Sequence, residues 1–437
     1  MIISDFTQYT SISERQAQLN AQLSALCQRN APSDESVLES VRQIVDEVRQ
    51  RGDAALREFA SRFDHASLAD IELSPTERKT LASQVSPEVK EAVQHALRNI
   101  RSFHSAQLPT MVEVETEAGV VCRQKAVPIQ TVGLYIPGGR APLFSTVLML
   151  AAPARIAGCK QIVLCTPQGA DGHIATEIIY AANECGVDHV YRVGGAQAIA
   201  AMAYGTETIP QVEKIFGPGN RYVTHAKQLV STHTAIDMPA GPSEVLVMAD
   251  HSAKAPYVAA DMLSQAEHGP DSQAMLVCDS LQFAESVAAE VDRQTALLPR
   301  KELVESSLSH SRIIVLPTRE ELIRFANAYA PEHLIISMEH PWTVAEEITA
   351  AGSVFVGQYS PESAGDYASG TNHTLPTSGW ARSCSGLNID SFMRKITFQE
   401  LTREGLTSLS PTIVTMAQAE GLQAHARAVT IRTEGEV

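Results

Sequence analysis

The sequence lacks any cluster of lysine and arginine. Its 34 basic residues are outnumbered by 50 acidic ones, which gives the 437-residue chain a formal net charge of -16. A surface of this sign repels phosphate groups, both those of nucleic acid and those of an anionic membrane. We therefore expect neither nucleic acid nor a membrane among its partners.

Paired cysteines are also missing. The seven cysteines are scattered, odd in number and never spaced as Cys-x-x-Cys, which argues against a thiolate metal site or a disulfide framework and favours reduced thiols in the core. No apolar run is long enough to span a bilayer, and residues 1–20 lack the features of a secretory signal. These absences predict a cytoplasmic protein.

Aromatic residues make up only 5% of the chain, whereas hydrophobic residues in total reach 44%, a composition typical of a globular α/β protein. The length exceeds that of one ordinary core. Over residues 132–238, and again over 243–356, apolar strands alternate with helices, which predicts parallel, doubly wound sheets. Two such series suggest a duplicated βα module. Further helices are expected at 344–351, 397–403, 406–419 and 424–429.

The chain has neither a Gly-x-Gly-x-x-Gly fingerprint nor a P-loop. Three glycine-rich turns nevertheless follow predicted strands, at residues 137–139, 194–197 and 217–220. At the carboxyl ends of parallel strands, such turns let a ligand approach backbone N–H groups. Two interpretations explain these turns: a site for a dinucleotide or phosphate, or ordinary turns that connect strands to helices.

Gln265 and His268 lie three residues apart at the end of a predicted helix, because Gly269 and Pro270 cannot continue it. Two donors on adjacent turns of one helix face can reach a single ion. The alternative is a surface glutamine beside a capping histidine.

Two further stretches carry groups that can transfer protons or bind metal. Glu332 and His333 lie where a helix ends and a strand begins, and together offer two proton acceptors to one substrate. The polar segment 360–373 contributes Asp366 and His373. With Gln265 and His268, Asp366 and one more histidine form a nitrogen and oxygen set suited to Zn²⁺. A capping glutamate, a half-buried histidine and a solvated loop remain the alternatives.

Seven stretches, in this order, resemble the histidinol dehydrogenase family. They are residues 133–139, 193–200, 216–220, 237–244, 265–270, 331–334 and 369–373. The resemblance extends over essentially the whole chain. It implies an α/β fold with two Rossmann-like, doubly wound parallel-sheet domains, one inserted in the other, and helical N- and C-terminal dimerisation segments.

The resemblance also implies domain boundaries. Residues 1–27 are expected to form the N-terminal helical dimerisation segment, and residues 28–134 with 243–387 the main domain that carries most zinc and catalytic residues. Residues 135–242 are expected to form the inserted NAD-contacting domain, and 388–437 a helical segment that completes the active site of a partner subunit.

The activity implied is oxidation of L-histidinol to L-histidine through histidinal, in two NAD-dependent steps, by a zinc-dependent homodimer with one Zn²⁺ per subunit. The implied zinc ligands are Gln265, His268 and Asp366, with His425 from the other subunit. Zinc in this arrangement orients the substrate.

The same resemblance implies that Glu332 and His333 are the proton acceptors. His333 takes the proton of the alcohol, and Glu332 activates the water that adds to the aldehyde. The implied substrate contacts are Ser243, Gln265, His268, His333, Asp366, His373, Glu420 and His425. The implied NAD contacts are Tyr135, Gln197 and Asn220.

Two other functional classes fit parts of the pattern. A zinc hydrolase uses a carboxylate, a histidine and a metal, but it needs no glycine turns. A two-lobed small-molecule binding protein suits two βα domains, but such a protein is exported, and the chain carries no signal segment.

Overall fold

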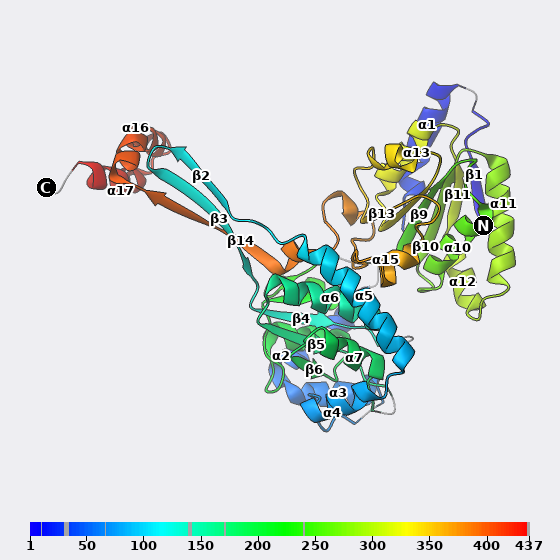
Figure 1. The fold of residues 1–437 in the computed structure, drawn as a ribbon, viewed down its shortest axis with the longest axis horizontal. Coiled ribbons are helices and arrows are strands. Elements are labelled where there is room, and N and C mark those ends of the chain that lie inside the picture. The colour runs from blue at the N-terminus through cyan, green and yellow to red at the C-terminus, as the bar shows by residue number, and fades with distance from the viewer. Residues whose placement is uncertain are drawn as a thin grey trace.

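The computed structural model describes residues 1–9, 11–29, 35–65, 67–138, 142–169, 172–238 and 241–434. It confirms the predicted α/β class with parallel sheets, and it adds an antiparallel arm (Figure 1). Among the described residues, every helix is too short or too polar to cross a membrane.

The first sheet has six parallel strands in the order β1-β11-β10-β9-β12-β13. Alternate residues of its strands enter two separate cores, since Val245 and Val247 face one helix layer and Leu246 and Met248 face the other. The strands are β1 (Ile2–Asp5), β9 (Glu244–Ala249), β10 (Gln273–Cys278), β11 (Arg312–Val315), β12 (His333–Ser337) and β13 (Ser353–Val356). The helices on its two faces are α10 (Ala255–Ala266), α11 (Leu281–Thr295) and α12 (Lys301–Leu308) on one, and α1 (Ile12–Leu26), α13 (Arg319–Tyr329) and α14 (Pro341–Ala345) on the other.

The second sheet has five parallel strands in the order β6-β5-β4-β7-β8. These strands are β4 (Thr131–Tyr135), β5 (Gln161–Cys165), β6 (His189–Tyr191), β7 (Lys214–Phe216) and β8 (Ala235–Ile236). In chain order, β4 to β8 and β9 to β13 are arranged identically across their sheets, and β1 extends the larger sheet at one edge. This shared order supports the predicted duplication of a βα module.

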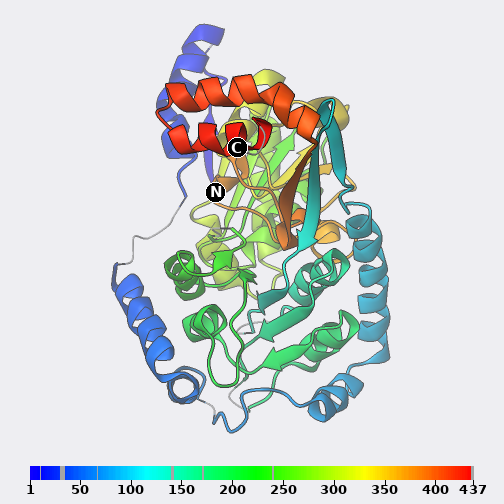
Figure 2. The same cartoon turned by 90° about the vertical axis from the view of Figure 1, so that its left-hand side faces the viewer.

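Within the part of the chain that the structure describes, eight helices associate with the smaller sheet. They are α2 (Glu35–Arg51), α3 (Asp53–Phe63), α4 (Pro75–Ser83), α5 (Pro87–Ser105), α6 (Phe144–Ala157), α7 (Thr176–Glu184), α8 (Gly195–Tyr204) and α9 (Arg221–Val230). Val41 of α2 shares a core with Ile199 of α8, and Leu97 of α5 shares one with Leu148 of α6. Figure 2 shows α2 and α5, in blue, on opposite sides of the lower domain.

This packing differs from the grouping expected for the main domain. Residues 28–134 were expected to join residues 243–387, whereas the helices of 35–105 pack on the sheet of 131–236. The physical reason is the apolar stripe on α2 and α5, which finds its complement on α6 and α8. Residues 1–27 hold a strand as well as a helix, because β1 pairs with β11. The dimerisation role of that segment stays a prediction.

The arm consists of β2 (Val112–Glu117), β3 (Val120–Pro128), β14 (Met393–Leu401), α16 (Arg403–Ala419) and α17 (Gln423–Thr433). Its strands form an antiparallel sheet that extends away from the body, with both helices at the far end (Figure 1). The helix expected at 397–403 is therefore wrong, since residues up to Leu401 pair with β3. The helix expected at 344–351 is displaced, because Pro341 begins α14 and the helix ends at Ala345.

Candidate functional site

Glu332 and His333 lie at the amino end of β12, beside the first residue of β9, Glu244. The Glu244 backbone N–H donates to Glu332 Oε2 at 2.8 Å, and His333 Nδ1 donates to the Glu244 carbonyl at 3.2 Å. One peptide segment thus holds both side chains. In open parallel sheets ligands usually bind beyond the carboxyl ends of the strands. Glu332 and His333 instead lie at the amino ends of the strands of this sheet.

Burial moves the pKa values of these two side chains in opposite directions. Because burial disfavours the charged form, it lowers the pKa of His333 to about 3 and raises that of Glu332 well above its usual range, although the Glu244 N–H opposes the latter shift. His333 is therefore neutral with its hydrogen on Nδ1, and Nε2 carries a lone pair with no hydrogen-bond partner among the described residues. The lone pair on Nε2 is therefore available to accept a hydrogen bond from a bound ligand.

A second cluster joins the end of α10 to α15 (Glu362–Tyr367). Donor atoms of His268, Glu362 and Asp366 all lie within 4.8 Å of one another. Gln265 is fully buried beside them, and its amide nitrogen, once oriented to donate, lies 2.6 Å from Glu362 Oε1. His333 connects the two clusters, since its Nε2 is 3.8 Å from Asp366 Oδ1.

The chemistry of this cluster fits a divalent cation. Glu362 and Asp366 are carboxylates placed side by side in a buried site, and burial raises the pKa of both, with Asp366 adding to the shift of Glu362. Two neighbouring buried carboxylates are costly unless a cation compensates them. With an imidazole and an amide oxygen as the other donors, the set suits Zn²⁺.

Glu362 is the residue of this site that the sequence interpretation missed. It lies within the polar segment 360–373, and its carboxylate is also 3.7 Å from His333 Nδ1. Its spacing of four from Asp366 was the available signal, because two carboxylates at that spacing share one helix face. The segment showed no apolar periodicity, and so α15 was not expected there.

His373 lies between the cluster and the smaller sheet domain. Its Nδ1 donates to the Asp366 carbonyl at 3.0 Å, and its Nε2 is 3.3 Å from Thr146 Oγ1 of α6. Burial lowers the pKa of His373 to about 4, which keeps the ring neutral. Ser243 directly precedes β9, and its carbonyl accepts from the Gln273 N–H at 3.2 Å. The structure thus brings His373 to the site and places Ser243 next to Glu244.

The glycine-rich turns converge on Tyr135 at the carboxyl end of β4. Its hydroxyl accepts from the Gly195 N–H at 3.1 Å, and a Cβ added at Gly217 would lie 2.1 Å from its carbonyl oxygen. Gly138 and Gly194 both pack closely against Pro167. Gly139 lies outside the described residues, as do Pro239 and Ala240 of the segment 237–244.

The turn at Gly217 is fixed by a buried ion pair between Lys227 and Asp237. Lys227 Nζ donates to the Gly217 carbonyl at 2.9 Å, and Asp237 Oδ2 accepts from the Gly217 N–H at 2.8 Å. Asn220 then caps α9, since its Oδ1 accepts from two N–H groups of the first turn. The three expected NAD contacts, Tyr135, Gln197 and Asn220, thus lie at the carboxyl edge of one sheet.

Glu420 and His425 are not brought to this site within one chain. Glu420 ends α16 and His425 lies on α17, and both are exposed. Their helices lie at the opposite end of the molecule from α10 and α15 (Figure 1). The expected ligand set is therefore incomplete in a single chain.

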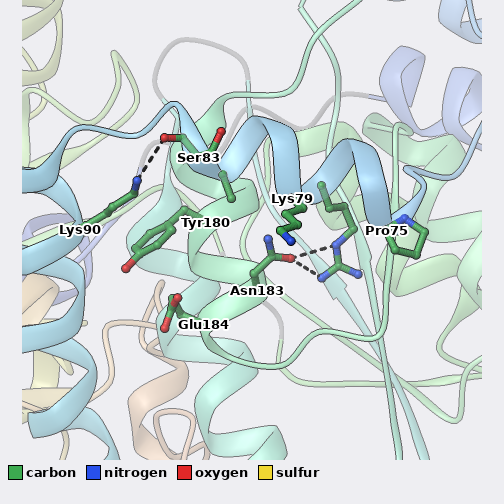
Figure 3. A pocket seen from close by; sticks show the side chains of 9 residues that line it. Pro75, Lys79, Ser83, Lys90, Tyr180, Asn183 and Glu184 are labelled. Carbon is green, nitrogen blue, oxygen red and sulfur yellow. Dashed lines mark hydrogen bonds between the residues drawn. The ribbon is translucent and has the colours of Figure 1, made fainter.

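A separate surface pocket of about 420 Å³ lies between α4, α5 and α7 (Figure 3). Arg78 lines it, but its guanidinium donates to Asn183 Oδ1 and to the carbonyls of Val187 and Asp188. The arginine therefore serves mainly to attach α4 to α7. None of the expected site residues lines this pocket.

The chain has clear relatives among known proteins. Residues 27–433 match the histidinol dehydrogenase family. The chain is 54% identical over 412 residues to histidinol dehydrogenase of Bacteroides thetaiotaomicron, which covers 94% of this chain and 96% of that protein. It is 50% identical over 433 residues to histidinol dehydrogenase of Escherichia coli strain K12, which covers 98% and 97%.

The crystal structure of histidinol dehydrogenase from Elizabethkingia anophelis superposes with a TM-score of 0.93 at 49% identity. The match covers 95% of this chain and 96% of that chain. The similarity therefore extends to the whole fold and includes both sheet domains.

Proposed function

This chain belongs to the histidinol dehydrogenase family, and we propose that it oxidises L-histidinol to L-histidine through histidinal in two NAD-dependent steps, the last reaction of histidine biosynthesis. The observation that carries the proposal is the junction of two clusters, since His333 lies against Glu332 on one side and Asp366 on the other. A proton acceptor is thereby placed beside a set of metal-binding donors.

Gln265, His268 and Asp366 are proposed to hold Zn²⁺, together with His425 of a second subunit. Two observations support this assignment. The side chains of His268, Glu362 and Asp366 lie close together, and the carboxylates of Glu362 and Asp366 are buried. When bound, zinc supplies a template that binds the imidazole and amino groups of the substrate and so orients its alcohol carbon.

His333 is proposed to take the alcohol proton through Nε2 while the carbon loses hydride, which leaves an aldehyde. Its Nδ1–H bond to the Glu244 carbonyl supports this role, because it keeps the lone pair on Nε2. NAD⁺, when bound, supplies the hydride acceptor for each of the two steps.

Glu332 is proposed to take a proton from the water that adds to the aldehyde. Loss of hydride from the resulting hydrate, with its proton passing to His333, gives the carboxylic acid. The raised pKa of Glu332 supports this role, because burial makes the carboxylate, once ionised, a stronger base.

The remaining contacts follow the same family assignment. Ser243, His373 and the partner-derived Glu420 are proposed to contact the substrate, and Tyr135, Gln197 and Asn220 to contact NAD. The position of His373 between α15 and α6 supports transfer between a substrate on one domain and a dinucleotide on the other.

A homodimer with shared active sites is proposed on the basis of the arm. Its strand β2 is exposed along its whole length, and apolar side chains protrude from the arm. The largest exposed apolar residues of the arm are Val112, Val114, Ile396, Phe398, Leu401, Met416, Leu422 and Ile431. Exposed apolar residues in such number are typical of a protein interface, and a second copy supplies both the cover and His425.

The seven free thiols support the proposed cytoplasmic location, where cysteines stay reduced. Family membership decides against the hydrolase and the exported binding protein as alternatives.

The proposed activity is tested by incubating the protein with Zn²⁺, histidinol and NAD⁺ and measuring NADH and histidine. Two NADH per histidine are expected, because the reaction removes four electrons. One NADH per product, or none, contradicts the proposal.

A further inference from the structure

Glu244 occupies an unusual place in the active site, because its peptide groups bind both proton acceptors. Its N–H donates to Glu332 and its carbonyl accepts from His333. On the other side of β9, Glu244 pairs in register with Gln273 of β10. A shift of this one residue therefore moves both Glu332 and His333.

The side chain of Glu244 is in turn held by Arg29, a residue of the N-terminal segment. Arg29 Nε and Nη2 donate to the two carboxylate oxygens at 2.8 and 2.9 Å, which is a bidentate pair. The Glu244 side chain is 1% exposed and that of Arg29 is 14% exposed. Such a pair is shielded from solvent, unlike an ion pair on the surface.

Arg29 itself is fixed from three directions. Its guanidinium lies 3.7 Å from the centre of the Tyr329 ring, Nη2 donates to the Tyr329 carbonyl at 2.7 Å, and Nη1 donates to the Cys27 carbonyl at 2.9 Å. Tyr329 ends α13, three residues before Glu332. The arginine is thus anchored to the same turn that leads into the catalytic pair.

We propose that Arg29 is a positioning residue for both oxidation steps, acting through Glu244 on Glu332 and His333. Without the guanidinium, a buried carboxylate is left with no cation, which is unfavourable, so the Glu244 side chain moves toward water. That movement displaces the Glu244 peptide. The expected effect on kcat rests on the proposed function. The chain of contacts from Arg29 through Glu244 to Glu332 and His333 does not depend on that function.

The test compares Arg29→Ala with a matched control, Arg15→Ala. Arg15 also belongs to the N-terminal segment, and its Nε lies 2.8 Å from Glu321 Oε1 in a pair with side chains 7% and 4% exposed. That pair joins α1 to α13, and among the described residues neither side chain has a hydrogen bond to a residue of the site. Both variants are expected to lower Tm, whereas only Arg29→Ala lowers kcat, by about 100-fold for both steps, with zinc content unchanged.

One further variant and one additive separate positioning from folding. Arg29→Lys keeps the charge but lacks the planar fork, and it is expected to fold and to show an intermediate kcat. Added guanidinium is expected to restore part of the activity of Arg29→Ala and to leave the activity of Arg15→Ala unchanged. A wild-type kcat in both Arg29 variants, or equal losses in the Arg29→Ala and Arg15→Ala proteins, overturns the proposal.

Hydrogen exchange at the Glu244 amide gives a readout that needs no substrate. Protection is expected in the wild type and in Arg15→Ala, and faster exchange in Arg29→Ala or Arg29→Lys. Unchanged exchange in both Arg29 variants overturns the positioning role. A wild-type protein that makes no NADH from histidinol instead overturns the proposed function, so the two failures are distinguishable.

Discussion

Glu332 and His333 are neighbours in the sequence, yet the same burial shifts their pKa values in opposite directions. It keeps the His333 ring neutral and makes the Glu332 carboxylate more basic, because in each case the charged form loses its hydration. The peptide groups of Glu244 orient both side chains, because the N–H donates to Glu332 and the carbonyl accepts from His333. At the scale of single residues, the proposed division of work between Glu332 and His333 therefore rests on the surroundings of each side chain.

Glu332→Gln is expected to slow oxidation of the aldehyde by about 10²- to 10⁴-fold, the usual contribution of a positioned base, while oxidation of the alcohol survives. The amide oxygen still accepts from the Glu244 N–H, but it cannot take a proton from water. Single-turnover measurements with histidinol and with histidinal check this, and histidinal is expected to accumulate. Equal losses in the two steps contradict the assigned role.

Glu362→Gln is expected to weaken zinc binding by about 10- to 100-fold, the usual cost of losing a partner of a metal ligand. The Glu362 carboxylate orients the Gln265 amide and adds negative charge beside His268 and Asp366. Competition with a chelator measures the affinity without relying on activity. Glu267→Gln is the control, since it removes an exposed charge next to His268 outside the cluster, and an equal effect in both variants argues against a specific role.

The glycine-rich turns show how separate elements cooperate. Gly217 follows β7 with φ of +122°, a conformation that side chains rarely adopt, and Lys227 of α9 and Asp237 after β8 bind its two peptide groups. Three elements thus define the backbone of one turn. Its place beside Tyr135, between β4 and β7, is where the strand order of the sheet reverses, the usual position for a dinucleotide.

Gly217→Ala is expected to lower stability by about 1–3 kcal/mol from backbone strain alone, and to weaken NAD⁺ binding as well, because its Cβ would displace the Tyr135 carbonyl. Thermal unfolding and titration with NAD⁺ measure the two effects. Gly172→Ala is the control, since Gly172 has φ of +77° and open space around a Cβ. Loss of stability with unchanged NAD⁺ affinity contradicts a role for this turn in binding.

The arm shows where local sequence patterns misled the interpretation of an element. Residues 397–403 were expected to be helical, but Ile396 and Phe398 belong to β14 and pair with Lys125 and Arg123 of β3. A partner strand more than 260 residues away decides their conformation. Propensity over a short window is a weak guide when such a partner exists.

In the molecule as a whole, the two sheets face the site with opposite ends of their strands. The smaller sheet contributes the carboxyl ends of its strands, where Tyr135 lies, and the larger sheet contributes the amino ends, where Glu244 and His333 lie. His373 bridges the domains through Thr146. This arrangement lets one domain carry the proposed dinucleotide and the other the substrate.

A mixture of His268→Ala and His425→Ala chains is expected to regain some activity, although each variant is inactive alone. In a mixed dimer, one of the two shared sites receives a normal His268 from one chain and a normal His425 from the other. Activity after unfolding and refolding the mixture together checks this. Confirmed mixed dimers without activity argue against sites shared between subunits.

The sequence by itself determined the alternation of strands and helices, the glycine turns, the Glu332-His333 pair and the motifs of the family, because these features reside in short segments with their own periodicity and turn chemistry. It could not assign α2 and α5 to the smaller sheet, reveal the strand β14, or identify Glu362 and Arg29 as neighbours of the site. Only the tertiary structure decided those points, since each depends on contacts between segments distant in the chain, such as Arg29 with Glu244 and Lys395 with Ala126. Local patterns set which elements form, and packing between them sets which side chains meet.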